Sequence, residues 1–307
     1  MQIAILIPIF NRQVNALIVA LNNQIERLSA NRIRVFCYDD CSTDQALELE
    51  NRICAQGLKH VVYTNLTKNL GRAAIRNKMI DEVAPQAEHL LFIDCDALPV
   101  ASCFLENYLK AIQQHPNSVL CGGRAKPHFA PTFDTLLHWL YDDRREALDA
   151  QTRNTNAALC FKSFNYLILA NLALKIRMSE AFTGYGHEDT HYGQLLKEAN
   201  IPILHLDNPL YHVGLDNRNS VLKKNQEAQH NLLIIKKLSP NLLTQIKLWQ
   251  AYQKTLLLPQ FIRTPFFKIL KNLTTQHLLH SQSPKLWVLD LYKLAALNEA
   301  FNFFKKT

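Results

Sequence analysis

The sequence predicts an α/β fold, in which helices cover both faces of a mostly parallel β-sheet and a helical extension follows. Three observations predict it. Short apolar runs alternate with segments of helical periodicity over about the first 94 residues. Polar motifs follow the ends of three of these runs, and the charge balance changes near residue 240.

The N-terminal elements follow in order. Apolar runs at 3–8 and 33–38 predict two strands, and apolar residues at helical spacing from Val14 to Leu28 predict the helix between them. A cap at 42–44 predicts a second helix, which Gly57 ends. A third strand at 60–63, a helix at 71–83 and a strand ending at Asp94 follow. This βαβαβαβ order implies a mostly parallel sheet.

Beyond about residue 116 the order becomes irregular. Apolar runs at 119–124 and 157–161 predict two further strands, and the stretch between them reads as helix and loop.

The motif Asp94-Cys95-Asp96 closes a buried strand. Residues two apart share a strand face, so the two carboxylates are expected to point together. They would repel each other unless a cation or proton compensates them, and a hard divalent ion bridging them to a diphosphate is one solution. The alternative is two solvated loop acids, or an N-cap for a helix near Ser102. Cys95 reads as small packing.

Three polar segments are expected to meet at one rim of the sheet. Ligands of such sheets lie beyond the carboxyl ends of the strands. Residues 8–12, Asp39-Asp40 and residues 94–96 all lie at those ends. Their convergence predicts a binding site more strongly than any one of them.

Two further clusters carry chemistry. Gly184 and Gly186 permit a tight loop before a helix that begins near Glu188. Acids in a first helical turn are favoured by the helix dipole, but Glu188 and Asp189 also suit a general base. His212 follows a strand, and it would become a metal ligand only if the fold returns it to the aspartate pair.

Composition narrows the class of protein. Hydrophobic residues make up 48% of the 307, which excludes wholesale disorder. Seven scattered cysteines without a Cys-x-x-Cys pair indicate a reducing compartment. We expect no signal peptide. No apolar run approaches the roughly 18 residues that a helix needs to span a bilayer. Of the net charge of +8, residues 241–307 carry +7, from nine Lys or Arg against two acids.

Five of these segments, in order over about residues 1–215, resemble family 2 glycosyltransferases of the GT-A fold. Asp94-Cys95-Asp96 matches the Asp-x-Asp motif, and Gly184–Asp189 matches Gly-x-Gly-x-Glu-Asp. Residues 38–44 resemble the motif Asp-Asp-Gly-Ser-x-Asp, with Cys41 where glycine is usual. Residues 69–77 resemble the Asn-x-Gly…Arg-Asn helix start, and the first strand with residues 8–12 resembles the opening strand.

The resemblance implies an inverting, metal-dependent transferase that moves a sugar from a UDP-sugar to a hydroxyl of a glycan acceptor. Asp39 or Asp40 would accept a hydrogen bond from the uracil imide. Arg72 and Arg76, at a helix start, would suit the diphosphate. The implied donor-binding set is Pro8, Phe10, Arg12, Asp39, Asp40, Arg72, Arg76, Asp94 and Cys95.

The resemblance also implies the metal ligands and the base. Asp96 would hold Mn²⁺ or Mg²⁺, with Asp94 beside it and His212 as a last ligand; imidazole favours Mn²⁺. Asp189 would take the proton of the acceptor hydroxyl, while Glu188 would bind the acceptor or donor sugar.

The implied organisation is a catalytic domain over 1–240, with a nucleotide-sugar half at 1–115 and an acceptor half at 116–240. The acceptor would be a glycan or lipid-linked glycan, in the assembly of a cell-surface polysaccharide or lipopolysaccharide. The enzyme would be cytoplasmic or peripheral on the inner face of the membrane. Residues 241–307 lie outside the resemblance. Their basic, amphipathic helices either lie in an anionic membrane interface or pack on the catalytic domain. No nucleic-acid module is recognisable, so no nucleic-acid partner is expected.

Two rival functions remain. A sugar nucleotidyltransferase would need a glycine-rich loop for a triphosphate, and residues 8–13 contain no glycine. A non-catalytic sugar or lipid-glycan binding protein would not need both acid pairs, 94/96 and 188/189.

Overall fold

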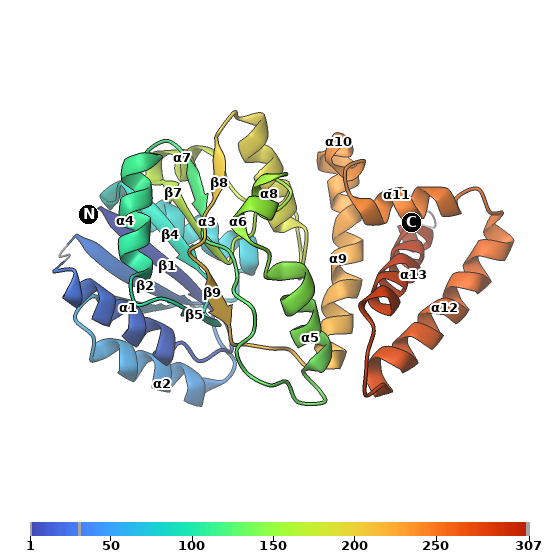
Figure 1. Ribbon diagram of the computed structural model, residues 1–307, viewed down its shortest axis with the longest axis horizontal. Helices are drawn as coiled ribbons and strands as arrows, with labels where there is room; N and C mark the ends of the chain where they lie inside the picture. The colour runs from blue at the N-terminus through green and yellow to red at the C-terminus, as the bar shows by residue number, and fades with distance from the viewer. Residues whose placement is uncertain (1, 30–31, 305–307) are drawn as a thin grey trace. The chain divides into compact units, whose positions relative to one another are not determined.

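A computed structural model describes residues 2–29 and 32–304, and it confirms the α/β fold with a helical C-terminal region (Figure 1). The main sheet of this described part has the strand order β3-β2-β1-β4-β7-β6-β8. Its first four strands in the chain are parallel neighbours, whereas β7 runs antiparallel to both β4 and β6. The strands are β1 (Ile3–Ile9), β2 (Ile33–Asp39), β3 (Val61–Asn65), β4 (His89–Ile93), β6 (Val119–Cys121), β7 (Asn165–Leu169) and β8 (Ile203–His205).

A second, two-stranded sheet pairs β5 (Ala97–Pro99) with β9 (Leu210–His212). This small sheet matters for function, because it joins the segment after Asp96 to His212 across more than a hundred residues of sequence.

The chain divides into two compact units. The first comprises residues up to 128 with 145–180 and 192–214, and the second comprises 129–144, 181–191 and the chain from 215 onward. The helices of the first unit are α1 (Asn15–Arg27), α2 (Gln45–Gln56), α3 (Arg72–Val83), η1 (Ala84–Gln86), α4 (Phe104–Gln114), α6 (Ala150–Asn154) and α7 (Ala170–Lys175). The π-helical turn η2 (Asp142–Glu146) and α8 (Glu188–Glu198) run from one unit into the other.

Alternation along the strands explains how the first unit is layered. In β1, Ile3, Ile5 and Ile7 face a core made with α1 and α4, whereas Ala4 and Leu6 face a second core made with α3 and α7. All five are fully buried, so β1 is covered on both faces, as a central strand of a parallel sheet must be. Figure 1 shows α1 and α4 over the same face of this sheet.

Two local predictions are corrected. Residues 157–161 were expected to form a strand but form turns, because Cys160 N–H donates to Asn156 O (3.0 Å) and Phe161 N–H to Ala158 O (3.3 Å). The strand that enters the sheet is β7, four residues later. Strand β4 ends at Ile93, so Asp94 and Asp96 lie in a turn closed by Ala97 N–H donating to Asp94 O (3.1 Å), and strand alternation does not orient them.

The second unit is helical. Its helices are α5 (Leu136–Tyr141), α9 (Arg218–Leu238), α10 (Pro240–Leu243), α11 (Lys247–Thr255), α12 (Gln260–His280) and α13 (Leu286–Phe304). Helix α13 packs against both α9 and α12 (Figure 1). The predicted domain boundary after residue 240 falls at the first residue of α10, inside this unit. Residues 305–307 of the predicted extension lie outside the described residues.

The tail contains both buried and exposed apolar residues. Trp249, Tyr252 and Phe301 stack with ring centroids 4.9–5.6 Å apart, and Leu242 and Leu243 are buried. Along α12, by contrast, Ile262, Phe266, Ile269 and Leu273 are exposed, while Phe267 is buried. Among the helices in the described part of the chain, none is long and apolar enough to cross a membrane.

Candidate active site

Asp39, the last residue of β2, is held by hydrogen bonds within the fold. Its Oδ1 accepts from Ser42 N–H (2.6 Å), and its Oδ2 accepts from Ser42 Oγ (2.8 Å) and Tyr63 Oη (3.1 Å). The side chain is almost fully buried. Burial and the Asp39 charge raise the pKa of Tyr63, so Tyr63 remains a donor at neutral pH. Asp39 therefore fixes the loop after β2.

Asp40 ties the same strand end to the start of α3. Its two oxygens accept the backbone N–H groups of Leu70 (2.7 Å) and Gly71 (2.9 Å). Burial raises the pKa of Asp40; these two hydrogen bonds act to lower it, but the neighbouring Asp39 adds to the rise. Asp40 accepts two hydrogen bonds in this way and Asp39 accepts three, so Asp40 retains more capacity to accept a hydrogen bond from a base.

Cys41 adopts the left-handed backbone conformation, with φ of 59°. That conformation is easiest for glycine, which explains the usual glycine at this position of the motif. The chain keeps the turn with cysteine, because Asn11, also left-handed, braces it: Asn11 N–H donates to Ser42 Oγ (2.8 Å), and Asn11 Oδ1 accepts from Thr43 N–H (2.8 Å).

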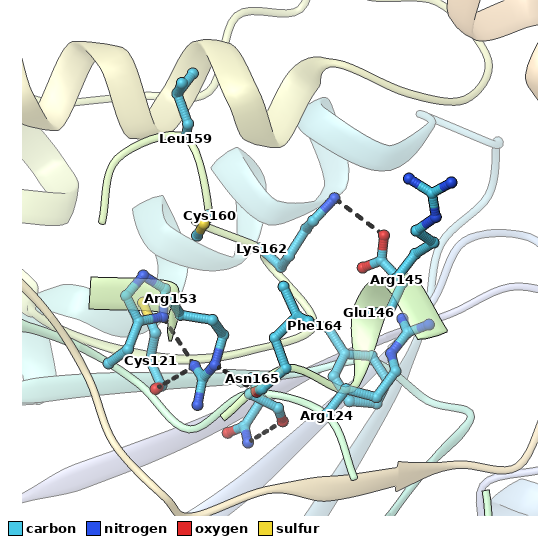
Figure 2. Close-up of a pocket in the computed structure, with 13 residues that line it drawn as sticks. Cys121, Arg124, Arg145, Glu146, Arg153, Leu159, Cys160, Lys162, Phe164 and Asn165 are labelled. Atoms are coloured by element: carbon cyan, nitrogen blue, oxygen red, sulfur yellow. Dashed lines mark hydrogen bonds and ion pairs between the residues drawn. The ribbon is translucent and has the colours of Figure 1, made fainter. Parts of the chain in front are cut away.

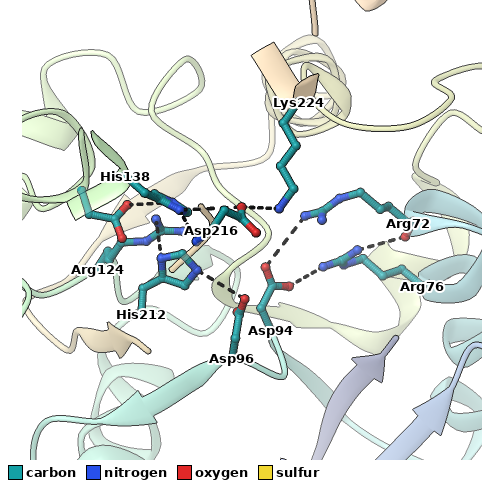
Figure 3. A network of polar contacts seen from close by, with 10 residues as sticks. Arg72, Arg76, Asp94, Asp96, Arg124, His138, His212, Asp216 and Lys224 are labelled. Atoms are coloured by element: carbon teal, nitrogen blue, oxygen red, sulfur yellow. Dashed lines mark hydrogen bonds and ion pairs between the residues drawn. The ribbon is translucent and has the colours of Figure 1, made fainter. Parts of the chain in front are cut away.

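Asp94 faces the two arginines that begin α3. Arg76 donates to Asp94 Oδ1 in a short contact, and Arg72 Nη2 lies 3.9 Å from Asp94 Oδ2. Arg76 is almost fully buried and also donates to Arg72 O (2.9 Å), so its position is fixed. Both arginines thus lie beside the aspartate motif (Figure 3).

Asp96 meets His212. The β5–β9 pairing sets Ala97 opposite His212, and Asp96 Oδ2 then lies 3.3 Å from His212 Nε2. Gly214 packs directly against Asp96, since a Cβ at position 214 would lie 2.5 Å from the Asp96 Cβ. Burial acts to raise the pKa of Asp96, but the hydrogen bond and charge of His212, with Arg12 and Arg124 nearby, lower it well below its usual range. The fold thus returns His212 to the aspartate pair, which was the condition for a ligand.

Arg124 completes this cluster, although no sequence motif predicts it there. Its Nη1 lies 3.4 Å from His212 Nδ1, and its guanidinium lies 4.4 Å above the Phe164 ring. Figure 3 shows Arg72 and Arg76 on the side of Asp94, and His212 with Arg124 on the side of Asp96. The aspartates therefore lie in a ring of cationic or protonatable side chains.

The remaining predicted donor-site residues of the N-terminal strand lie around this rim. Pro8 is half-buried near the end of β1, Phe10 is 44% exposed, and Arg12 is close enough to Asp96 to lower the pKa of its carboxyl. Cys95 packs against the core under α1 and α4, and burial raises the pKa of its thiol. A packing role, as the sequence suggested, accounts for Cys95.

Glu188 and Asp189 occupy the first turn of α8, in the second unit. The loop before them is left-handed at Gly184, Gly186 and His187. Asn231 of α9 fixes this loop, since its Nδ2 donates to the carbonyls of Thr183 (3.0 Å) and Gly186 (2.8 Å). Glu188 is buried, whereas Asp189 is half-buried and so more accessible to a substrate.

Conformation requires both glycines of this loop, and close approach to α9 also requires Gly186, since the Glu227 side chain near Gly184 can move aside. A Cβ on Gly186 would lie 2.6 Å from the Ala228 Cβ, and one on Gly184 would lie 2.9 Å from Glu227 Oε2. The Gly-x-Gly motif thus lets the loop pack directly on α9. Neither Asn231 nor Arg124 belongs to a motif of the sequence, and only the folded chain reveals them.

The side chains around Asp96 fit a divalent metal ion. Two ligands at right angles, each about 2.1 Å from an ion, are about 3.0 Å apart, close to the 3.3 Å between Asp96 Oδ2 and His212 Nε2. One carboxylate and one imidazole suit Mn²⁺ better than Mg²⁺. Asp94, engaged by Arg76, is placed beside this pair rather than within it.

Comparison with known proteins identifies the family. The profile of "Glycosyl transferase family 2" matches residues 4–167, which is more than half of the chain. No curated protein sequence matches the chain.

Solved structures share the fold. The structure of TarS 1–349 from S. aureus has a TM-score of 0.54 at 15% identity, covering 99% of this chain and 92% of that one. TarS 1–349 in complex with UDP-GlcNAc has a TM-score of 0.52 at 15% identity, with the same coverage. The mannosyltransferase PcManGT from Pyrobaculum calidifontis, in complex with GDP-Man and Mn²⁺, has a TM-score of 0.55 at 13% identity, covering 100% of this chain and 88% of that one.

Proposed function

The chain belongs to glycosyl transferase family 2 and is a glycosyltransferase, and from this premise we propose that it is an inverting, metal-dependent enzyme that uses a UDP-sugar. One observation carries the proposal: Asp96 and His212, 116 residues apart, meet at 3.3 Å beside Asp94 and its two arginines. Two similar structures, one in complex with UDP-GlcNAc and the other with GDP-Man and Mn²⁺, agree with a nucleotide-sugar donor and a divalent ion.

Asp96 and His212 would hold Mn²⁺ or Mg²⁺, with Asp94 next to them. When bound, the ion would neutralise charge on the departing diphosphate. Arg72 and Arg76 would contact the same diphosphate from the start of α3, where backbone N–H groups also favour an anion. Asp40, which has capacity left for a further hydrogen bond, is the better of the two predicted partners for the uracil imide.

Asp189 would act as the general base. It would remove the proton of the acceptor hydroxyl while that oxygen attacks the anomeric carbon and the bond from this carbon to the UDP oxygen breaks, with inversion. Asp189 is more accessible than its buried neighbour Glu188, which suits Glu188 to binding a sugar rather than to accepting a proton.

A donor-hydrolysis screen tests this function. A panel of UDP-sugars is incubated with the protein and MnCl₂, and released UDP is measured with and without excess chelator. We expect one UDP-sugar to be hydrolysed with MnCl₂ alone and not when excess chelator removes the metal ion. Metal-dependent binding without any turnover would contradict the enzyme proposal and favour a sugar-binding protein.

We further propose that the acceptor is a cell-surface glycan met at an anionic membrane, and that α12 faces that membrane. Ile262, Phe266, Ile269 and Leu273 recur at i, i+4, i+7 and i+11, so they form one stripe, and all four are exposed. Residues 241–307 carry nine basic side chains against two acidic ones. An exposed apolar stripe in a basic region suits a membrane interface.

Vesicle sedimentation tests the membrane proposal. Wild-type protein should sediment with vesicles containing phosphatidylglycerol and bind less at high salt, since each basic residue near such a surface contributes about 1 kcal/mol. The variant Phe266→Ser with Ile269→Ser should lose this binding. A matched variant at another exposed apolar residue, Ile53→Ser on α2, should retain it; equal loss in both variants would overturn the assignment to α12.

A further inference from the structure

A cavity of about 210 Å³ lies in the first unit next to the aspartate cluster. Its walls come from the end of β6, the start of β7 and the segments 145–148 and 159–164. Pockets for drug-sized ligands begin near 300 Å³, so this cavity suits a single sugar residue or one of its substituents. None of the sequence motifs falls in it.

The charge of the cavity is strongly positive. Four cationic side chains line it, against the single carboxylate of Glu146. Lys162 Nζ lies 3.6 Å from Glu146 Oε1. Figure 2 shows Arg124, Arg145, Glu146 and Lys162 gathered on one side of the view, and Arg153 beside Cys121 and Asn165 on the other. The cationic residues are Arg124, Arg145, Arg153 and Lys162.

Arg153 contributes a buried positive charge. The side chain is 6% exposed, and its guanidinium donates to the carbonyls of Cys121 (3.1 Å) and Leu206 (2.8 Å) and to His205 Nδ1 (2.8 Å). Among the described residues, none of its hydrogen bonds goes to a carboxylate. A buried cation without an acid in contact raises the local potential and favours an anion nearby.

The fold makes room for this buried arginine. Gly123 is left-handed (φ of 80°), and a Cβ there would lie 2.5 Å from Arg153 Cζ. His205 adds no charge, because its Nδ1 accepts from Arg153, which leaves the proton on Nε2 facing Ala157 O (3.0 Å). Burial lowers the pKa of His205 and so favours the same neutral form.

The cavity adjoins the reaction centre. Arg124 both lines the cavity and contacts His212, while Phe164, another lining residue, accepts the backbone N–H of Asp94 (3.1 Å). The diphosphate of a donor would be held on the other side of the aspartates, by Arg72 and Arg76 (Figure 3). A second anionic group that reaches the cavity would therefore be carried by a sugar rather than by the donor diphosphate.

Resting on the glycosyltransferase function above, we propose that this cavity binds the carboxylate or phosphate group of an acidic acceptor, through Arg124, Arg145 and Lys162. Guanidinium and ammonium groups bind both kinds of anion through charge-assisted hydrogen bonds. The acceptor is then an acidic glycan, carrying either a uronic acid or a sugar phosphate, rather than a neutral one.

Ligand-observed NMR on the full chain, without donor or metal, tests this inference with D-glucuronate, D-glucose 6-phosphate and D-glucose. We expect one or both anions to bind and glucose not to bind; preference for glucuronate indicates a uronic acid, and preference for the phosphate indicates a phosphorylated acceptor. The double variant Arg145→Gln with Lys162→Gln should weaken anion binding at least about tenfold. Lys110→Gln, whose side chain is 65% exposed on α4, is the matched control and should bind as wild type.

Glu146→Gln gives an independent readout should the double variant fail to fold. Removing the only carboxylate of the cavity lining should strengthen anion binding several-fold. Equal binding of glucose and the two anions, or unchanged anion binding in the double variant and in Glu146→Gln, would overturn the inference. Metal-dependent UDP binding is measured separately, so its persistence would show that the proposed function stands without the acidic acceptor.

Discussion

Two pairs of aspartates lie at the ends of strands β2 and β4 of the same sheet, and the two pairs have different roles. Asp39 and Asp40 follow β2 and accept hydrogen bonds mainly from backbone N–H groups and hydroxyls of nearby loops. Asp94 and Asp96 follow β4 and instead face arginines and a histidine. One pair is used chiefly to close loops, and the other forms a charged site.

The comparison shows that the partners of a carboxylate, more than its place at a strand end, indicate its role. Neutral donors satisfy Asp39 and hold a turn in place. Asp94 instead pairs with arginines, and the cationic groups near Asp96 lower the pKa of its carboxyl, which keeps Asp96 ionised and able to bind a cation. Substitutions in the two pairs should therefore separate into losses of activity and losses of stability.

The largest effect is expected for Asp96→Ala. Loss of a ligand that helps to neutralise a departing diphosphate removes several kcal/mol of transition-state stabilisation, and turnover should fall at least about 10³-fold. The melting temperature should change little, because Asp96 lies beyond the strand end. Steady-state kinetics with the hydrolysed UDP-sugar measures this, and an active variant would remove the distinction between the pairs.

Asp189→Asn extends the comparison to the third acid pair. It keeps the shape of the side chain and removes its basicity, so turnover should fall about 10²–10⁴-fold with donor binding unchanged. Glu188→Gln should affect KM more than kcat. The reverse pattern would mean that the roles of the accessible and the buried acid are exchanged.

Asp39→Ala should act on stability instead. It leaves the Ser42 N–H, the Ser42 hydroxyl and the Tyr63 hydroxyl without their acceptor, at a cost of about 1–3 kcal/mol. Thermal unfolding measures the loss, and residual turnover at low temperature should exceed that of Asp96→Ala. An unchanged melting temperature together with abolished activity would place Asp39 in the charged site instead.

The smallest effect is expected at Cys41. Because its φ is 59°, Cys41→Gly should relieve strain and stabilise the protein by about 0.5 kcal/mol after the entropic cost of glycine. Cys41→Ala keeps the Cβ and should give no such gain. Chemical unfolding of both variants measures the difference, and equal stabilities would show that the turn is not strained.

Much of this arrangement could be predicted from the chain. Periodicity placed the strands and helices up to β4 to within a few residues, and the polar residues at their ends indicated the site. Periodicity failed at 157–161, where an apolar run forms turns, since short apolar stretches look alike in strands and in buried turns.

Long-range pairings decide the rest. The β5–β9 ladder brings His212 to Asp96, and sequence could state this only as a condition. Arg124 and Arg153 look like ordinary basic residues until the fold sets them around one cavity. The basic tail illustrates the same limit, because its Trp249 and Tyr252 are buried whereas the α12 stripe is exposed, although both read as apolar faces.

Thermal unfolding with UDP is the most direct test of the charged site. At a hundredfold excess over Kd, UDP with Mn²⁺ should stabilise the protein by about 2.7 kcal/mol, which is about 4 °C for a chain of this size. UDP in excess chelator should give little shift, and Asp96→Asn should give none under either condition. Asp81→Asn, an exposed aspartate on α3, should shift as wild type does. A UDP shift that survives in chelator and in Asp96→Asn would contradict a metal-dependent donor site at Asp94, Asp96 and His212.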